Sequence, residues 1–280
     1  MSRRLLITGA SGFIGAHLAA LAAQDGEWDV HAASRRDTDL LDPAAVDRLI
    51  AAAKPTHLIH LAWFVEPGAY WTSPENHRWV EASAHLFRTF AEHGGERLIG
   101  AGTSAEYDWS VNGAMREDTT PLRPATLYGE SKKRLYELAQ ATGISSAWGR
   151  IFMVYGPGEP PTRFIPRMIR ALRDGEPAVC TAPDAARDFI YVRDVAAALL
   201  AMAKSDVIGA VNIGTGVATT LREVVQLLVA QLGHGENIRE QPGHEPPLVV
   251  ADIARLRGEV GFTPSIDLRQ GLELTIRQRR

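Results

Sequence analysis

A tyrosine and a lysine four residues apart could together move a proton. Tyr128 and Lys132 stand at positions i and i+4 of a segment expected to be helical, so their side chains should share one face. An ammonium group beside a phenol favours the phenolate and lowers the pKa of the phenol. Such a tyrosine can exchange a proton with a carbonyl or alcohol oxygen while a nicotinamide exchanges a hydride. An ordinary surface pair is the alternative at this common spacing.

A hydroxyl residue stands at the end of the expected strand that precedes the helix of this pair. Thr103 follows an apolar run at 97–101, where its hydroxyl group would hold the oxygen atom that reacts. The alternative role for Thr103 is to cap a helix or to close a turn. We predict Thr103, Tyr128 and Lys132 as the catalytic residues.

Three glycines near the N-terminus have the spacing of a phosphate-binding turn. They lie between an apolar run at 5–7 and an alanine-rich segment at 14–23. The first allows a tight turn, the second the close approach of a pyrophosphate, and the third close packing of helix and strand. The N-terminus of the helix also offers N–H donors to an anion. A turn without a ligand is the alternative. The predicted dinucleotide-binding residues here are Gly9, Ser11, Gly12, Phe13, Ile14 and Gly15.

Basic residues follow the second expected strand, at 29–33. NAD-binding proteins of this type usually carry an acidic residue there, which bonds the ribose hydroxyl groups. This chain has Ser34, Arg35 and Arg36 instead, and a guanidinium group can make paired, charge-assisted bonds to the 2′-phosphate of NADP. We therefore predict NADP(H), with NAD(H) as the less favoured cofactor. The alternative is that these arginines form a solvated loop.

Short apolar runs alternate with helical segments through most of the chain. Strands are expected at 5–7, 29–33, 57–62, 97–101, 146–154 and 211–213, and helices at 14–23, 43–53, 75–93, 128–142, 194–203 and 221–232. This alternation is typical of an α/β fold with a doubly wound parallel sheet of the Rossmann type, covered on both faces.

The composition of the sequence changes after Gly156, where prolines and glycines become frequent. We expect a smaller C-terminal substrate lobe, interleaved with the first domain. Residues 1–156 with about 188–216 are predicted to bind NADP, and residues 157–187 with 217–280 to form the substrate-binding lobe.

Composition excludes several classes of protein. The formal net charge of −3 leaves no basic excess for a nucleic acid backbone. Cys180 is the single cysteine, so an intrachain disulfide and a cysteine zinc site are excluded, and no metal site is predicted. No run reaches the roughly 20 apolar residues of a membrane span. We therefore expect a cytoplasmic protein without a membrane segment or a nucleic acid partner.

These motifs, in this order, resemble the extended short-chain dehydrogenase/reductase family, in its group of sugar-nucleotide epimerases, dehydratases and reductases. Four more segments are similar to the family: His60-Leu61-Ala62, Arg150 to Pro157, Arg187 to Asp194, and Asn212 to Gly216. The first resembles the segment after the family's fourth strand, along the cofactor, and the second a segment near the nicotinamide. The resemblance implies cofactor contacts by Asp39, Leu40, Leu61, Ala62, Trp63, Phe152, Met153 and Val154. A plain helix cap is the alternative for Asp39.

The resemblance also implies a substrate site in the C-terminal lobe. Arg187 is a candidate ligand of the nucleotide pyrophosphate, with a salt bridge between lobes as the alternative. Phe164 is a candidate contact of the base, with core packing as the alternative, and Ser104 is a candidate substrate contact beside Thr103. Relatives often dimerise through the helices after the fourth and fifth strands, which are expected here at 75–93 and 128–142. We accordingly expect a homodimer that binds a nucleotide sugar.

Departures from the family narrow the reaction. Dehydratases of the group carry Asp and Glu directly after the threonine, where this chain has Ser104 and Ala105. Epimerase-reductases that make fucose nucleotides carry a cysteine at the position of Ala105. The pair Glu106-Tyr107 is similar to reductases of GDP-4-keto-6-deoxymannose type.

We therefore predict NADPH-dependent reduction of the 4-keto group of a nucleotide-linked 4-keto-6-deoxyhexose, with Tyr128 as proton donor. The alternatives are a redox-neutral NDP-sugar 4-epimerase, a reductase of a non-nucleotide substrate and a non-catalytic NADP-binding protein.

Two further departures concern the cleft. Met153 stands where many relatives carry an asparagine that contacts the diphosphate. Trp79 stands where many relatives carry an asparagine near the cofactor. We therefore expect an unusually apolar cleft, which Trp63, Trp71, Trp79 and Trp109 could line, although core packing is the alternative for each.

Overall fold

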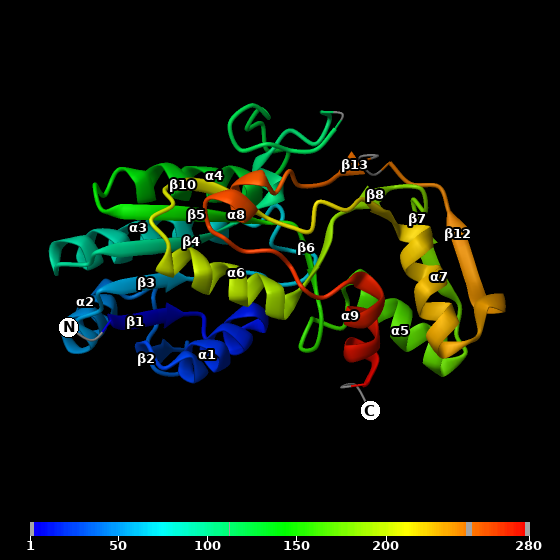
Figure 1. Ribbon diagram of the computed structural model, residues 1–280, viewed down its shortest axis with the longest axis horizontal. Helices are drawn as coiled ribbons and strands as arrows, with labels where there is room; N and C mark the ends of the chain where they lie inside the picture. The colour runs from blue at the N-terminus through cyan, green and yellow to red at the C-terminus, as the bar shows by residue number, and fades with distance from the viewer. Residues whose placement is uncertain (1–2, 112, 245–247, 278–280) are drawn as a thin grey trace.

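Six parallel strands form the central sheet of the protein, in the order β10-β5-β4-β3-β1-β2 (Figure 1). The computed structural model describes residues 3–111, 113–244 and 248–277. The strands are β1 (Arg3–Thr8), β2 (Trp28–Ala33), β3 (His57–His60), β4 (Arg97–Thr103), β5 (Ser145–Ile151) and β10 (Gly209–Ile213). Because β1 pairs with β2 on one side and with β3 on the other, the strand order reverses at β1. Ligands of open α/β sheets bind beside the carboxyl ends of the strands at such a point.

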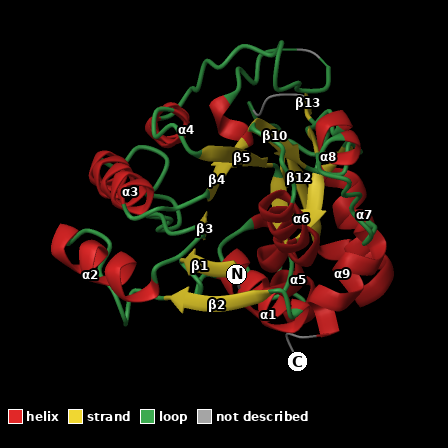
Figure 2. Cartoon of the chain, turned by 60° about the vertical axis from the view of Figure 1, so that its left-hand side comes forward, coloured by secondary structure: helices red, strands yellow, loops and turns green. Residues whose placement is uncertain are grey.

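Helices cover both faces of this sheet (Figure 2). On one face lie α2 (Pro43–Ala53), α3 (Glu75–Glu92) and α4 (Leu127–Gln140), and on the other α1 (Phe13–Asp25) and α6 (Val192–Lys204). Successive strand residues point to opposite faces. Leu5 and Ile7 therefore pack in the core with α1 and α6, while Leu6 packs in the core with α2, α3 and α4. The predicted doubly wound α/β fold is confirmed.

A smaller C-terminal lobe has its own core (Figure 1). Its helices are α5 (Phe164–Asp174), α7 (Leu221–Leu232) and α9 (Leu268–Arg277), and α8 (Ala254–Gly258) packs against β10 of the main sheet. Its short strands are β7 (Ala178–Thr181) with β12 (Ile238–Gln241), and β8 (Ala186–Arg187) with β11 (Thr219–Thr220) and β13 (Leu248–Val249). The boundaries between the two domains stay a prediction.

Two expectations about the strands were wrong in detail. The expected strand 146–154 is two strands, because β5 ends at Ile151 and β6 (Met153–Tyr155) pairs with β9 (Phe189–Tyr191) outside the main sheet. The expected strand 57–62 ends at His60. Helices α3 and α4 lie where helices were expected, at 75–93 and 128–142. A homodimer through these two helices stays a prediction.

The helix α5 was not anticipated. Pro166 stands in its first turn, where a proline costs no hydrogen bond within the helix. No helix within the described ranges combines the length and the apolar character that crossing a bilayer requires. The same ranges contain no group of three or more His, Cys, Asp or Glu side chains placed to hold a metal ion.

Candidate active site

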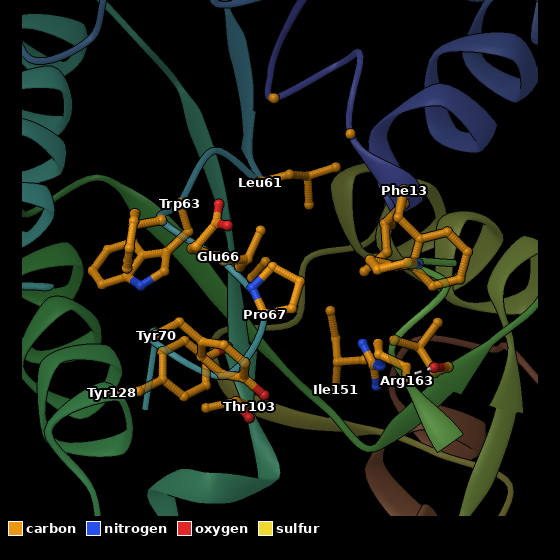
Figure 3. A pocket seen from close by; sticks show the side chains of 18 of the residues that line it. Phe13, Leu61, Trp63, Glu66, Pro67, Tyr70, Thr103, Tyr128, Ile151 and Arg163 are labelled. Carbon is orange, nitrogen blue, oxygen red and sulfur yellow. Dashed lines mark hydrogen bonds between the residues drawn. The ribbon is translucent and has the colours of Figure 1, made fainter. Parts of the chain in front are cut away.

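A cavity of about 1250 Å³ opens at the carboxyl ends of the sheet strands and extends to the C-terminal lobe. Figure 3 shows part of its lining, with Thr103 and Tyr128 toward one end and Phe13 and Arg163 toward the other. All of the predicted site residues except Arg36 line this cavity. The fold therefore brings segments together that are far apart in the sequence.

The glycine turn shapes one wall of the cavity. Gly9 has a φ of +71°, and a Cβ atom there would lie 2.7 Å from the backbone nitrogen of Ala62. A Cβ atom on Gly15 would lie 2.0 Å from the carbonyl oxygen of Gly9. Helix α1 begins directly after Gly12, with no side-chain cap and no acidic residue in its first turn. Its N-terminus can therefore donate N–H groups to a pyrophosphate, and these residues fit a dinucleotide.

The turn after β2 differs from the expectation in one respect. Ser34 and Arg35 line the cavity, whereas Arg36 is exposed and does not. The hydroxyl group of Ser34 donates to Asp37 Oδ2 at 2.5 Å and its backbone N–H donates to the same oxygen at 3.2 Å. This bonding closes a tight turn that carries Arg36 outside the cavity lining, and Asp37 went unnoticed in the sequence.

Two further predicted cofactor contacts follow this turn. Asp39 and Leu40 both line the cavity. Asp39 Oδ1 accepts a hydrogen bond from the backbone N–H of Leu41 at 3.1 Å, whereas the side chain of Asp42 caps α2. Asp39 is therefore not the helix cap that was its alternative role.

Thr103 and Tyr128 meet at the inner end of the cavity. The Thr103 hydroxyl group favours the ionised form of the Tyr128 phenol, although burial has the larger effect on its pKa. Thr103 Oγ1 also accepts the backbone N–H of Ala105 at 3.2 Å, so this residue caps a short helical turn as well (η1, Ser104–Glu106). Helix α4 presents Tyr128 in its first turn, after Thr126 has capped the helix.

Burial changes the acidity of the predicted catalytic pair. It raises the pKa of the Tyr128 phenol above its ordinary value and lowers the pKa of the Lys132 ammonium group to about 7. Both shifts arise because each group loses the water that stabilises its charged form. The pKa of Tyr128 is therefore raised, opposite to the expected lowering, because burial is the largest influence on this phenol.

An aromatic segment, residues 63–76, covers Tyr128. The rings of Tyr70 and Trp71 meet the Tyr128 ring edge to face, at centroid distances of 5.0 and 5.6 Å. The carbonyl oxygen of Trp71 accepts the backbone N–H of Tyr128 at 3.1 Å. Asn76 is fully buried and its side-chain amide donates to the carbonyl oxygens of Tyr70 and Ser73, at 2.7 and 2.9 Å. Sequence reasoning missed Tyr70 and Asn76, because no motif marks them.

The predicted substrate residues line the far part of the cavity and its inner end. Arg187 on β8 is buried and donates to the carbonyl oxygen of Ala186 at 2.9 Å. Phe164 begins α5, and Ser104 is buried beside Thr103. All four tryptophans expected in the cleft, together with Met153, belong to the lining.

Two arginines on the lobe side were missed. Arg163 and Arg167 line the cavity four residues apart at the start of α5. Arg163 Nε pairs with Glu159 Oε1 at 3.0 Å. The sequence signal was the spacing of four residues between the two arginines. That spacing places both side chains on one face only in a helix, and α5 was not predicted.

The carboxylate closest in sequence to Thr103 points away from the cavity. Glu106 Oε1 accepts the backbone N–H of Thr103 and Nε1 of Trp148, each at 2.9 Å. Its Oε2 accepts Nε of Arg150 at 2.9 Å, and both side chains of this ion pair are almost completely buried. Glu106 therefore does not replace the acid and base that are missing at Ser104 and Ala105.

Comparison with known proteins gives a family match and three similar proteins. Residues 5–214 match the model of the NAD dependent epimerase/dehydratase family. The dTDP-glucose 4,6-dehydratase of Streptomyces griseus is 28% identical, covering 99% of this chain and 94% of the relative. The GDP-6-deoxy-D-mannose reductase of Pseudomonas aeruginosa is 29% identical, covering 97% and 95%. The structure of MoeE5 in complex with UDP-glucuronic acid and NAD is 32% identical, covers 99% of each chain and superposes with a TM-score of 0.86.

Replacing Gly15 with alanine should weaken NADPH binding, because the added methyl group overlaps the carbonyl of Gly9. Overpacking of this kind also costs about 1–3 kcal/mol of stability. Quenching of tryptophan fluorescence by NADPH and equilibrium unfolding in urea measure the two effects. Gly258→Ala is the matched control, since a Cβ atom there meets nothing within 4 Å. An unchanged NADPH affinity in Gly15→Ala would contradict the assignment of the turn.

Replacing Glu106 with glutamine should lower the free energy of unfolding by about 3–5 kcal/mol, because Arg150 is left as a buried charge without its counterion. Urea unfolding followed by circular dichroism measures this loss. Glu137→Gln breaks an exposed pair with Arg134 and should cost less than about 1 kcal/mol. Equal costs for the two variants would show that the buried pair is unimportant.

Proposed function

Because this chain belongs to the NAD dependent epimerase/dehydratase family, whose members use NAD(P) to modify sugar nucleotides, we propose that it reduces the 4-keto group of a nucleotide-linked 4-keto-6-deoxyhexose with NADPH. The observation that carries this proposal is that the hydroxyl residues Thr103 and Tyr128 line the same cavity and lie close enough to influence each other. Both hydroxyl groups can donate to one carbonyl oxygen. A ketone in this position would be polarised and held for reduction.

Proton supply favours reduction. Burial raises the pKa of Tyr128, so its phenol is protonated at neutral pH and can serve as an acid. A bound nicotinamide would supply the hydride to the carbonyl carbon. Tyr128 then protonates the alcohol oxygen, and the charge of Lys132 stabilises the phenolate that remains.

The residues after Thr103 argue against elimination of water. A dehydratase needs an acid and a base on the sugar, and Ser104 and Ala105 provide neither. Glu106, the next carboxylate, is already committed to Arg150 and Trp148. The similarity to a dTDP-glucose 4,6-dehydratase therefore covers the general arrangement of the site and not the acid and base that remove water.

Arginines on the lobe side suit the diphosphate of a nucleotide sugar. Arg163, Arg167 and Arg187 all line the cavity, and guanidinium groups bind phosphate oxygens in pairs. Phe164 lies next to Arg163 and can contact the base. In this arrangement the sugar reaches toward Tyr128 and the nucleotide lies on the lobe.

A redox-neutral 4-epimerase is the second candidate. MoeE5, at 32% identity, binds UDP-glucuronic acid and NAD. An epimerase would return the hydride to the sugar and would consume no cofactor, so the two functions differ in stoichiometry.

Turnover should depend on Tyr128. Purified protein should oxidise one equivalent of NADPH for each equivalent of a nucleotide-linked 4-keto-6-deoxyhexose, and Tyr128→Phe should reduce kcat by at least about 100-fold while NADPH still binds. Tyr136→Phe is the matched control, because Tyr136 lies on the same helix and outside the cavity lining. A change between sugar isomers without loss of NADPH would replace the reductase by the epimerase.

Arg35 should determine the preference for NADPH. Arg35→Ser should raise the Kd for NADPH about tenfold or more and leave the Kd for NADH nearly unchanged, since only NADPH carries the 2′-phosphate. Arg36→Ser removes the same charge beside the cavity and should have a much smaller effect. Isothermal titration measures both constants. Equal effects of the two variants would mean that general charge, and not contact by Arg35, favours NADPH.

A further inference from the structure

The ammonium group of Lys132 lies on the face of an indole ring. Lys132 Nζ is 4.0 Å from the centroid of the Trp63 ring and donates a hydrogen bond to the carbonyl oxygen of Ala101 at 3.0 Å. Lys132 is almost completely buried. A buried cation placed over an aromatic face is attracted by the negative potential of the ring, and this attraction grows when water is absent.

Trp63 is held so that it cannot turn away from Lys132. Its Nε1 donates to Asn76 Oδ1 at 2.9 Å, and Asn76 is anchored in turn to two backbone carbonyl groups of the aromatic segment. The ring of Trp79 packs against Trp63 at a centroid distance of 6.2 Å. The indole plane is therefore a rigid surface beneath the lysine.

The charged and titratable groups around Lys132 do not replace this contact. Glu106 raises the pKa of Lys132 from a distance, but its oxygens are bonded to Thr103, Trp148 and Arg150. His60 on β3 is neutral, since burial first and then Lys132 lower its pKa to about 3. Tyr128 on α4 is a neutral phenol at physiological pH. Lys132 therefore directly meets the negative potential of the neutral indole face and the carbonyl oxygen of Ala101.

We propose that Trp63 is a positioning residue that holds Lys132 as a cation beside Tyr128 through its indole face. This inference rests on the proposed function, because the cation is needed to stabilise the phenolate that forms when Tyr128 gives up its proton. Trp79 supports the indole from the position at which many relatives carry a polar asparagine.

Unfolding measurements test the contact without any substrate. Trp63→Leu removes the aromatic face, and Trp63→Phe keeps one. The difference in unfolding free energy between the two variants should be largest near pH 5.5, where Lys132 is charged, and should shrink above pH 7, where it is neutral. His60 does not interfere, since its pKa of about 3 lies below this range. A difference that does not vary with pH would overturn the proposal.

Kinetics then test the role in turnover. With a substrate that the protein reduces, kcat should fall at high pH as Lys132 loses its proton. In Trp63→Leu this decline should move to lower pH by about one unit, whereas Trp63→Phe should stay close to wild type. Should Trp63→Leu not fold, Trp63→Met gives the same comparison.

The two tests separate the two proposals. A pH-dependent stability difference without any reductase activity would retain the contact and refute the proposed reaction. Reductase activity with a pH profile unmoved in Trp63→Leu would retain the reaction and refute the positioning role.

Discussion

The buried carboxylate of Glu106 determines where the reacting groups stand. It binds the backbone of Thr103, the indole of Trp148 and the guanidinium of Arg150. Arg150 also donates to the hydroxyl group of Tyr107, which donates in turn to Asn212 on β10. The end of β4 is thus tied to β5 and β10 by one connected network. Because buried charges are tolerated only when every partner is satisfied, the network allows essentially one arrangement of the turn that carries Thr103.

Burial then changes the pKa values of the two titratable groups near this turn, Tyr128 and Lys132. The aromatic segment keeps water from Tyr128 and Lys132, and the loss of water raises the pKa of the phenol and lowers that of the ammonium group. In such a site the phenol is an acid in its resting state, and the lysine ammonium group contacts the face of Trp63 and the carbonyl oxygen of Ala101. Packing and proton transfer therefore depend on the same side chains.

The frame of the site is shared by relatives that carry out different reactions. The chain is similar along nearly its whole length to a dehydratase and to a reductase. The glycine turn, Tyr128 and Lys132 suit any reaction in which a nicotinamide exchanges a hydride with a sugar carbon. The difference lies in a few residues after Thr103, here Ser104, Ala105 and Glu106, whose side chain points away from the cavity. For this reason the residues after Thr103 carry more information about the reaction than the fold does.

The sequence by itself determined the doubly wound fold and about half of the residues that line the cavity. Alternating apolar runs predict strands and helices because burial requires that periodicity, and the glycine turn and the Tyr128–Lys132 spacing are local patterns. The helix α5 escaped notice because Pro166 looks like a break unless its place in the first turn is known. Only the tertiary structure placed Arg163 and Arg167 in the cavity lining and Arg36 outside it. It also directed the Glu106 side chain away from the cavity. It alone laid Trp63 beneath Lys132, 69 positions later in the chain. Contacts between distant segments and the loss of water around them arise from packing in three dimensions, which no spacing along the chain records.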